Sequence, residues 1–227
     1  MSKITSPSTL TEQVEYNGTH FGDLTWLVSP ETGSKVSYAS ARNKIKLIAF
    51  HLNARGLPPR SKIAVAANNG ISSCLTILGI IYAGHIALPL NLVAGSKIIA
   101  YTLDHAETAL IFTADDCEKL ISEALADFEK EIEVIKLDSQ LGPIWEKEAP
   151  NETFVKKGNV SAEEIAVIMY TSGTTGNPKG VMLSHSNLLA AGRYISSGHE
   201  VDHKDTALCV LPIYHINGLC VTVMGTL

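Results

Sequence analysis

Cysteine is scarce in this chain, which has four among its 227 residues. Cys74, Cys117, Cys209 and Cys220 show none of the paired spacings that zinc sites and redox motifs use. Cys74 and Cys209 stand in apolar runs, where we expect buried thiols. The N-terminus lacks the apolar core of a signal peptide. From these absences we expect a cytoplasmic protein.

Charged residues are also few, at 18 % of the chain with a net charge of −5. No cluster of basic residues is present, so we expect no nucleic-acid partner. Residues 63–96 carry no charged side chain, but Asn68, Asn69, His85 and Pro89 interrupt this run. We therefore expect a buried helix followed by a buried strand, and no integral membrane span.

Apolar periodicity predicts alternating helices and strands. Residues 1–35 lack such periodicity and are expected to be irregular, with a short strand around Trp26. Helices are expected over residues 40–56, 71–83, 96–107, 115–127 and 186–198. Strands are expected over residues 62–66, 85–88, 109–113, 132–135, 165–169, 181–183 and 205–211. This alternation predicts an α/β fold with a mainly parallel, helix-covered sheet.

One glycine-rich stretch, residues 170–180 (YTSGTTGNPKG), separates two apolar runs. Its polar groups and glycines are Thr171, Ser172, Gly173, Thr174, Thr175, Gly176, Lys179 and Gly180. Backbone N–H groups left open by glycine, hydroxyl groups and one cation together suit a polyphosphate.

Two other interpretations exist for this stretch. A turn without a ligand would use the same Gly, Asn and Pro residues. A Walker A loop shares the spacing from Gly173 to Lys179, but Pro178 and Gly180 replace that motif's Gly and Ser/Thr. A Walker loop also leads into a helix, whereas residues 181–183 predict a second strand. The Walker interpretation is rejected, and the plain turn stays open on these residues alone.

Residues 170–180 resemble the phosphate-binding signature of the adenylate-forming enzymes: acyl-CoA synthetases, luciferases and peptide-synthetase adenylation domains. Residues 83–91 resemble an early core motif of that superfamily, and residues 211–218 resemble the motif that lines its acyl pocket. The resemblance, strongest to acyl-CoA synthetases, implies ATP-dependent activation of a carboxylic acid as acyl-AMP. It also implies Mg²⁺, and CoA or a carrier-protein thiol as the acceptor.

The resemblance also implies roles for individual residues. Lys179 and His215 are the candidate catalytic residues, Lys179 at the β- and γ-phosphates and His215 beside the acyl group. Nucleotide binding is assigned to Thr171, Ser172, Gly173, Thr174, Thr175, Gly176 and Lys179. No residue is assigned to a metal. His185 is expected to bond to local backbone groups and is left outside the site.

A second histidine motif, His199 to His203 with Glu200 between, matches the zinc-protease pattern. That pattern binds zinc only on a helix, where both imidazoles share a face. Gly198 and the polar surroundings argue against a helix, so we predict no zinc site.

The resemblance places the adenine, ribose and hinge motifs and a C-terminal-domain lysine beyond Leu227. We therefore expect residues 1–227 to be an incomplete N-terminal large domain without adenylation activity of its own. Residues 212–219 contain no acidic side chain to pair with a substrate ammonium, which favours a fatty or other organic acid. The alternatives are an amino-acid or carrier-protein ligase of the same superfamily, and a non-catalytic binding module that retains the fold.

Overall fold

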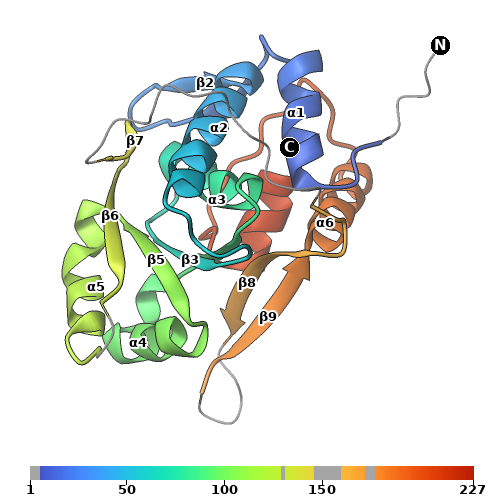
Figure 1. Cartoon of the computed structure of the whole chain (residues 1–227). Coiled ribbons are helices and arrows are strands. Elements are labelled where there is room, and N and C mark those ends of the chain that lie inside the picture. The colour runs from blue at the N-terminus through green and yellow to red at the C-terminus, as the bar shows by residue number, and fades with distance from the viewer. Residues whose placement is uncertain (1–5, 129–130, 146–159, 172–176) are drawn as a thin grey trace.

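The computed structural model describes residues 6–128, 131–145, 160–171 and 177–227. The main sheet contains β3 (Lys62–Ala66), β4 (Ile86–Pro89), β5 (Thr108–Thr113), β6 (Glu133–Asp138), β7 (Gly142–Pro143), β8 (Ile165–Thr171) and β9 (Lys179–Ser184). Their order across the sheet is β7-β6-β5-β3-β4-β8-β9 (Figure 1). The five inner strands run parallel, and the edge strands β7 and β9 each pair antiparallel with their neighbour. The predicted α/β class with a mainly parallel sheet is confirmed.

Helices cover both faces of this sheet. They are α1 (Leu10–His20), α2 (Tyr38–Ala54), α3 (Ile71–Tyr82), α4 (Ser96–His105), α5 (Glu118–Leu125) and α6 (His185–Gly198). The shorter helical segments are η1 (Leu92–Ala94), η2 (Asp115–Cys117) and the π-helical η3 (Gly218–Met224). A separate antiparallel pair is formed by β1 (Thr25–Val28) and β2 (Lys35–Ser37).

Side chains of successive strand residues point into two different cores, as the pleat of a strand requires. In β3, Ile63 and Val65 join the larger core with residues of α1, α2, α3 and α6. Ala64 and Ala66 join the smaller core with residues of α4 and α5. Both faces of the inner strands are therefore buried, as expected for a parallel sheet.

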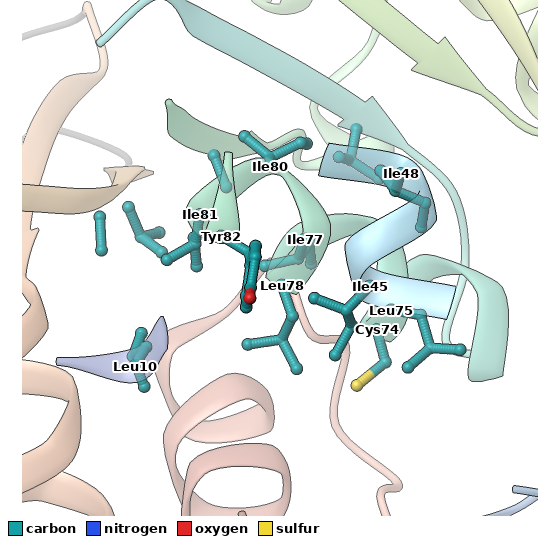
Figure 2. Close-up of a cluster of buried hydrophobic side chains, with 14 of the residues drawn as sticks. Leu10, Ile45, Ile48, Cys74, Leu75, Ile77, Leu78, Ile80, Ile81 and Tyr82 are labelled. Atoms are coloured by element: carbon teal, nitrogen blue, oxygen red, sulfur yellow. The ribbon is translucent and has the colours of Figure 1, made fainter. Parts of the chain in front are cut away.

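Helix α3 lies at the centre of the larger core, and its residues from Ser72 to Tyr82 are all buried. Figure 2 shows Ile45 and Ile48 of α2 beside the side chains of α3. A Cβ added at Gly79 would lie 2.5 Å from Ile48 Cγ2, so only glycine permits this close approach. The uncharged run is thus a buried helix followed by β4, as predicted. No helix in the described ranges is long and apolar enough to span a bilayer.

Helix α1 corrects the expectation that residues 1–35 are irregular. The Thr9 side chain accepts a hydrogen bond from the Glu12 N–H at 3.1 Å and so caps the first turn. Of its apolar residues only Leu10 and Val14 form the buried stripe, which is too short to produce clear periodicity. The buried face also includes Asn17, a polar residue that a hydrophobic pattern does not detect.

The strand predicted over residues 205–211 is also wrong. This segment pairs with no strand in the described part of the chain, and Leu208 and Val210 remain 72 % and 73 % exposed. A strand needs a hydrogen-bonded neighbour, which periodicity alone cannot supply. For the same reason Cys209 is only partly buried, whereas Cys74 is buried as expected. Burial raises the pKa of Cys74 to about 12.

Candidate functional site

The glycine-rich stretch connects β8 to β9 in an antiparallel hairpin (Figure 1). Thr171 at the end of β8 is the Cα partner of Lys179 at the start of β9, and both are exposed. The structure therefore brings these two predicted site residues together at the base of the loop. The other predicted residues of the loop, Ser172, Gly173, Thr174, Thr175 and Gly176, lie outside the described residues.

The strand after the loop distinguishes this hairpin from a Walker A loop. Lys179 begins a strand rather than a helix, and α6 follows only at His185. The prediction of a loop between two strands is confirmed. Lys179 forms no ion pair with any residue that the structure describes.

Tyr170 holds the base of the hairpin against α4. Its hydroxyl lies 2.6 Å from His105 Nδ1, and the ring of Tyr101 stacks on His105 at 5.4 Å between centroids. Burial raises the pKa of Tyr170, with Tyr101 as a second cause, so its hydroxyl remains protonated and can donate to the imidazole. Sequence analysis did not assign His105, although Tyr101 and His105 stand four apart on one helix face.

Gly180 allows this contact across the hairpin. It is the Cα partner of Tyr170, and an added Cβ would lie 3.3 Å from Tyr170 Cζ and 3.1 Å from Ile168 Cγ2. The tyrosine ring therefore packs over the position next to Lys179. A side chain at residue 180 would push the ring away from His105 or the strand away from β8.

His185, just after β9, is nearly fully buried at 2 % exposure. Its Nδ1 accepts a hydrogen bond of 3.1 Å from the backbone N–H of Leu10, at the start of α1. Burial lowers the pKa of His185 to about 4, against the opposing effect of Glu164 and Glu12, so the ring is neutral near pH 7. His185 does satisfy a backbone group, but a distant one rather than the local one expected.

His215 lies on a turn and not at a strand end, because residues 205–211 form no strand. Its backbone N–H donates to the Pro212 carbonyl at 2.9 Å, and its ring is exposed. The two preceding residues, Ile213 and Tyr214, are buried and fix the turn. Among the residues described, no hydrogen bond joins His215 to Lys179.

The second histidine motif is not helical. His199 is the C-terminal cap of α6, and Glu200 has a φ of 53°, which ends the helix. His199 and His203 therefore do not share a helix face. Over the described ranges, no group of three or more His, Cys, Asp or Glu side chains gathers at one point.

A cavity of about 500 Å³ opens between α1, α6 and the last described residues. Leu10, Gln13, Arg193, Glu200 and Leu227 are among its lining residues. Thr171, Lys179 and His215 are not, so the cavity is separate from the candidate site.

Comparison with known proteins agrees with this arrangement. Residues 14–227 match the family described as AMP-binding enzyme. Sulfoacetate–CoA ligase of Cupriavidus necator is 31 % identical over 219 residues, which are 96 % of this chain and 43 % of the ligase. The chain thus spans less than half the length of that relative.

Two solved structures share the fold. The N-terminal domain of FACL13 from Mycobacterium tuberculosis has a TM-score of 0.81 at 22 % identity, over 96 % of this chain and 55 % of that one. ATP-bound MatB from Rhodopseudomonas palustris has a TM-score of 0.76 at 26 % identity, over 94 % of this chain and 42 % of that one. With the family match covering nearly all of its residues, this chain belongs to the AMP-binding enzyme family.

Proposed function

We propose that the protein to which this chain contributes activates a carboxylic acid with ATP and transfers the acyl group to a thiol. In the first step a carboxylate oxygen attacks the α-phosphorus of ATP, the bond from that phosphorus to the bridging oxygen breaks, and pyrophosphate leaves. In the second step the thiol sulfur attacks the acyl carbon, its proton is lost to solvent, and AMP leaves. We propose CoA or a carrier-protein thiol as the acceptor.

The β8–β9 hairpin is the observation that carries this proposal. Negative charge accumulates on phosphoryl oxygens during adenylation, and fixed donors and cations stabilise it. The exposed Lys179 ammonium, without an ion-pair partner in the described chain, and the opposite residue Thr171 supply a cation and a hydroxyl. We assign Lys179 to the β- and γ-phosphates and Thr171 to a phosphate oxygen.

The remaining nucleotide contacts are proposed from the sequence of the loop. They are Ser172, Gly173, Thr174, Thr175 and Gly176. Mg²⁺ bound with ATP would add positive charge at the phosphates, and Mg²⁺ commonly keeps water and phosphate ligands. We assign no described side chain to it.

The relatives support a thiol ligase. One is named a sulfoacetate–CoA ligase, and MatB was solved with ATP bound. For the acid we propose an organic acid rather than an α-amino acid. The turn that carries His215 has no acidic side chain, and an ammonium buried without a carboxylate partner is costly. We propose that His215 orients the carboxylate and that the protein is cytoplasmic.

Acid-dependent exchange of pyrophosphate into ATP tests the proposal in the longer protein. A panel of fatty, short organic and amino acids identifies the substrate class. Lys179→Ala should reduce exchange by about 10²- to 10³-fold, the usual effect of losing one group that stabilises transition-state charge. The matched control is Lys35→Ala, which removes an exposed lysine of β2 and should leave exchange unchanged.

A non-catalytic binding module is the second candidate. It predicts that ATP binds without any acid-dependent exchange, and that Lys179→Ala weakens binding only. Equal rates of pyrophosphate exchange in Lys179→Ala and Lys35→Ala would contradict the role given to Lys179.

A further inference from the structure

The segment before His215 has few backbone partners of its own. Residues 205–211 pair with no strand that the structure describes, and the Val210 N–H donates to the nearby Leu208 carbonyl at 3.1 Å. His215 follows on the next turn. Something other than a sheet must fix where this turn lies.

Asn69 makes three hydrogen bonds to the main chain of residues 209–213. Its Nδ2 donates to the carbonyl oxygens of Cys209, at 3.1 Å, and Leu211, at 2.8 Å. Its Oδ1 accepts from the Ile213 N–H at 2.9 Å. One side-chain amide thus takes both its N–H groups and its oxygen to the main chain of a single segment.

Asn69 is itself held at the carboxyl edge of the sheet. It lies in the connection from β3 to α3, where Ser73 Oγ donates to the carbonyls of Asn68, at 2.8 Å, and Gly70, at 3.0 Å. These bonds hold the main chain on both sides of Asn69, so its amide starts from a fixed point rather than from a free loop.

The turn that Asn69 reaches is compact. A Cβ added at Gly218 would lie 2.2 Å from the Pro212 carbonyl oxygen, so the two ends of the turn are in close contact. Ile213 and Tyr214 are buried between them. A displacement at Ile213 would therefore move His215 with it.

We propose that Asn69 is a positioning residue that sets the place of the His215 turn relative to the carboxyl ends of the parallel strands. This inference rests on the proposed function, in which His215 orients the acid. Asn69 acts through the main chain of residues 209–213 and does not itself contact the substrate.

Hydrogen exchange in the 227-residue chain tests the link without any activity. Asn69→Ala should speed exchange of the Ile213 amide by at least about tenfold, since its acceptor is removed. Asn68→Ala is the matched control: it removes the neighbouring amide and its 2.7 Å bond to Asp116 Oδ2 but keeps the main-chain bonds from Ser73, and it should leave exchange of the Ile213 amide unchanged. Equal rates in Asn69→Ala and the parent chain would overturn the proposal.

A second variant covers the case in which Asn69→Ala fails to fold. Asn69→Asp has the same size and keeps the acceptor, but it turns carboxylate oxygen toward the Cys209 and Leu211 carbonyls. It should also accelerate exchange across residues 211–215. Unchanged protection there would contradict the link.

Kinetics of the longer protein separate positioning from simple stability. Asn69→Ala should raise KM for the acid by about tenfold or more while KM for ATP stays within about twofold. A parallel rise in both constants would overturn the assigned role. If the parent protein showed no acid-dependent pyrophosphate exchange, the proposed function would be rejected. The hydrogen-exchange result would still decide whether Asn69 fixes the position of residues 209–213.

Discussion

At the scale of single residues, His185 links two distant parts of the chain through one hydrogen bond. Its Nδ1 needs a lone pair to accept from the Leu10 N–H, so the bond exists only while the ring is neutral. The buried setting maintains that state by lowering the pKa of His185 to about 4. Protonation would remove the lone pair that accepts this bond and would set a ring N–H against the Leu10 N–H at the start of α1.

This bond predicts a specific loss of stability in acid. The folded pKa of about 4 is below the ordinary value of 6.5, so between these pH values the unfolded chain binds more protons. The contribution of His185 is present above pH 6.5 and falls by about 3 kcal/mol as pH decreases to 4. His185→Gln, which keeps an acceptor but cannot titrate, should lose less stability over this range.

Urea unfolding at several pH values measures the difference between the two proteins. Subtracting the variant's profile removes the titration of the carboxylates, which both proteins share. Parallel stability profiles from pH 7 to pH 4 would show that His185 is not the group responsible.

At the scale of elements, the β8–β9 hairpin and α4 form one unit. The Tyr170 ring lies between the backbone of Gly180 and the imidazole of His105, and Lys179 begins β9 beside them. Contacts on the face of the sheet that carries the smaller core therefore position Lys179. The hairpin was predictable from its turn residues and flanking apolar runs, but its contact with α4 was not.

Gly180→Ala should destabilise the chain by about 1 kcal/mol or more. The added methyl group meets Ile168 and Tyr170, and both are restrained: Ile168 by the core and Tyr170 by His105. Gly198→Ala is the control, because a Cβ there meets no atom within 4 Å. Chemical denaturation of both variants gives the comparison, and equal stabilities would show that the space at Gly180 is not restricted.

The prediction of elements succeeded where sequence and burial agree. Residues 62–66 were predicted as a strand and form β3, because both faces of that strand are apolar. It failed for α1, whose position depends on polar contacts with the other end of the chain, including Asn17 with the Leu227 carbonyl. It also failed for residues 205–211, since an apolar run cannot show whether a partner strand is present.

In the candidate site, too, features carried by the local sequence could be predicted and contacts between distant residues could not. Thr171, Lys179 and His215 could be predicted as candidates because local motifs carry them. Asn69, His105 and the role of Tyr170 were missed because hydrogen bonds between distant residues leave no periodic signal. Asn69, for instance, lies 144 positions before the backbone group that it accepts from.

At the scale of the whole molecule, we propose that the chain forms one side of the nucleotide site. It spans 43 % of the sulfoacetate–CoA ligase that it resembles. We therefore expect the purified 227-residue chain to show no acid-dependent pyrophosphate exchange, with circular dichroism confirming that it is folded. Exchange above the enzyme-free background would contradict this prediction and place all the essential groups within residues 1–227.

The contacts of α1 also imply an order of folding during synthesis. Gln13 Nε2 donates to the Leu227 carbonyl at 3.3 Å, and Leu10 donates to His185, so α1 packs on residues that are synthesised much later than it is. On a ribosome α1 emerges before any of these partners and an isolated helix of 11 residues is marginal in water. We therefore expect α1 to stay largely unfolded until the strands between α1 and His185 have assembled and the sequence around His185 has been synthesised.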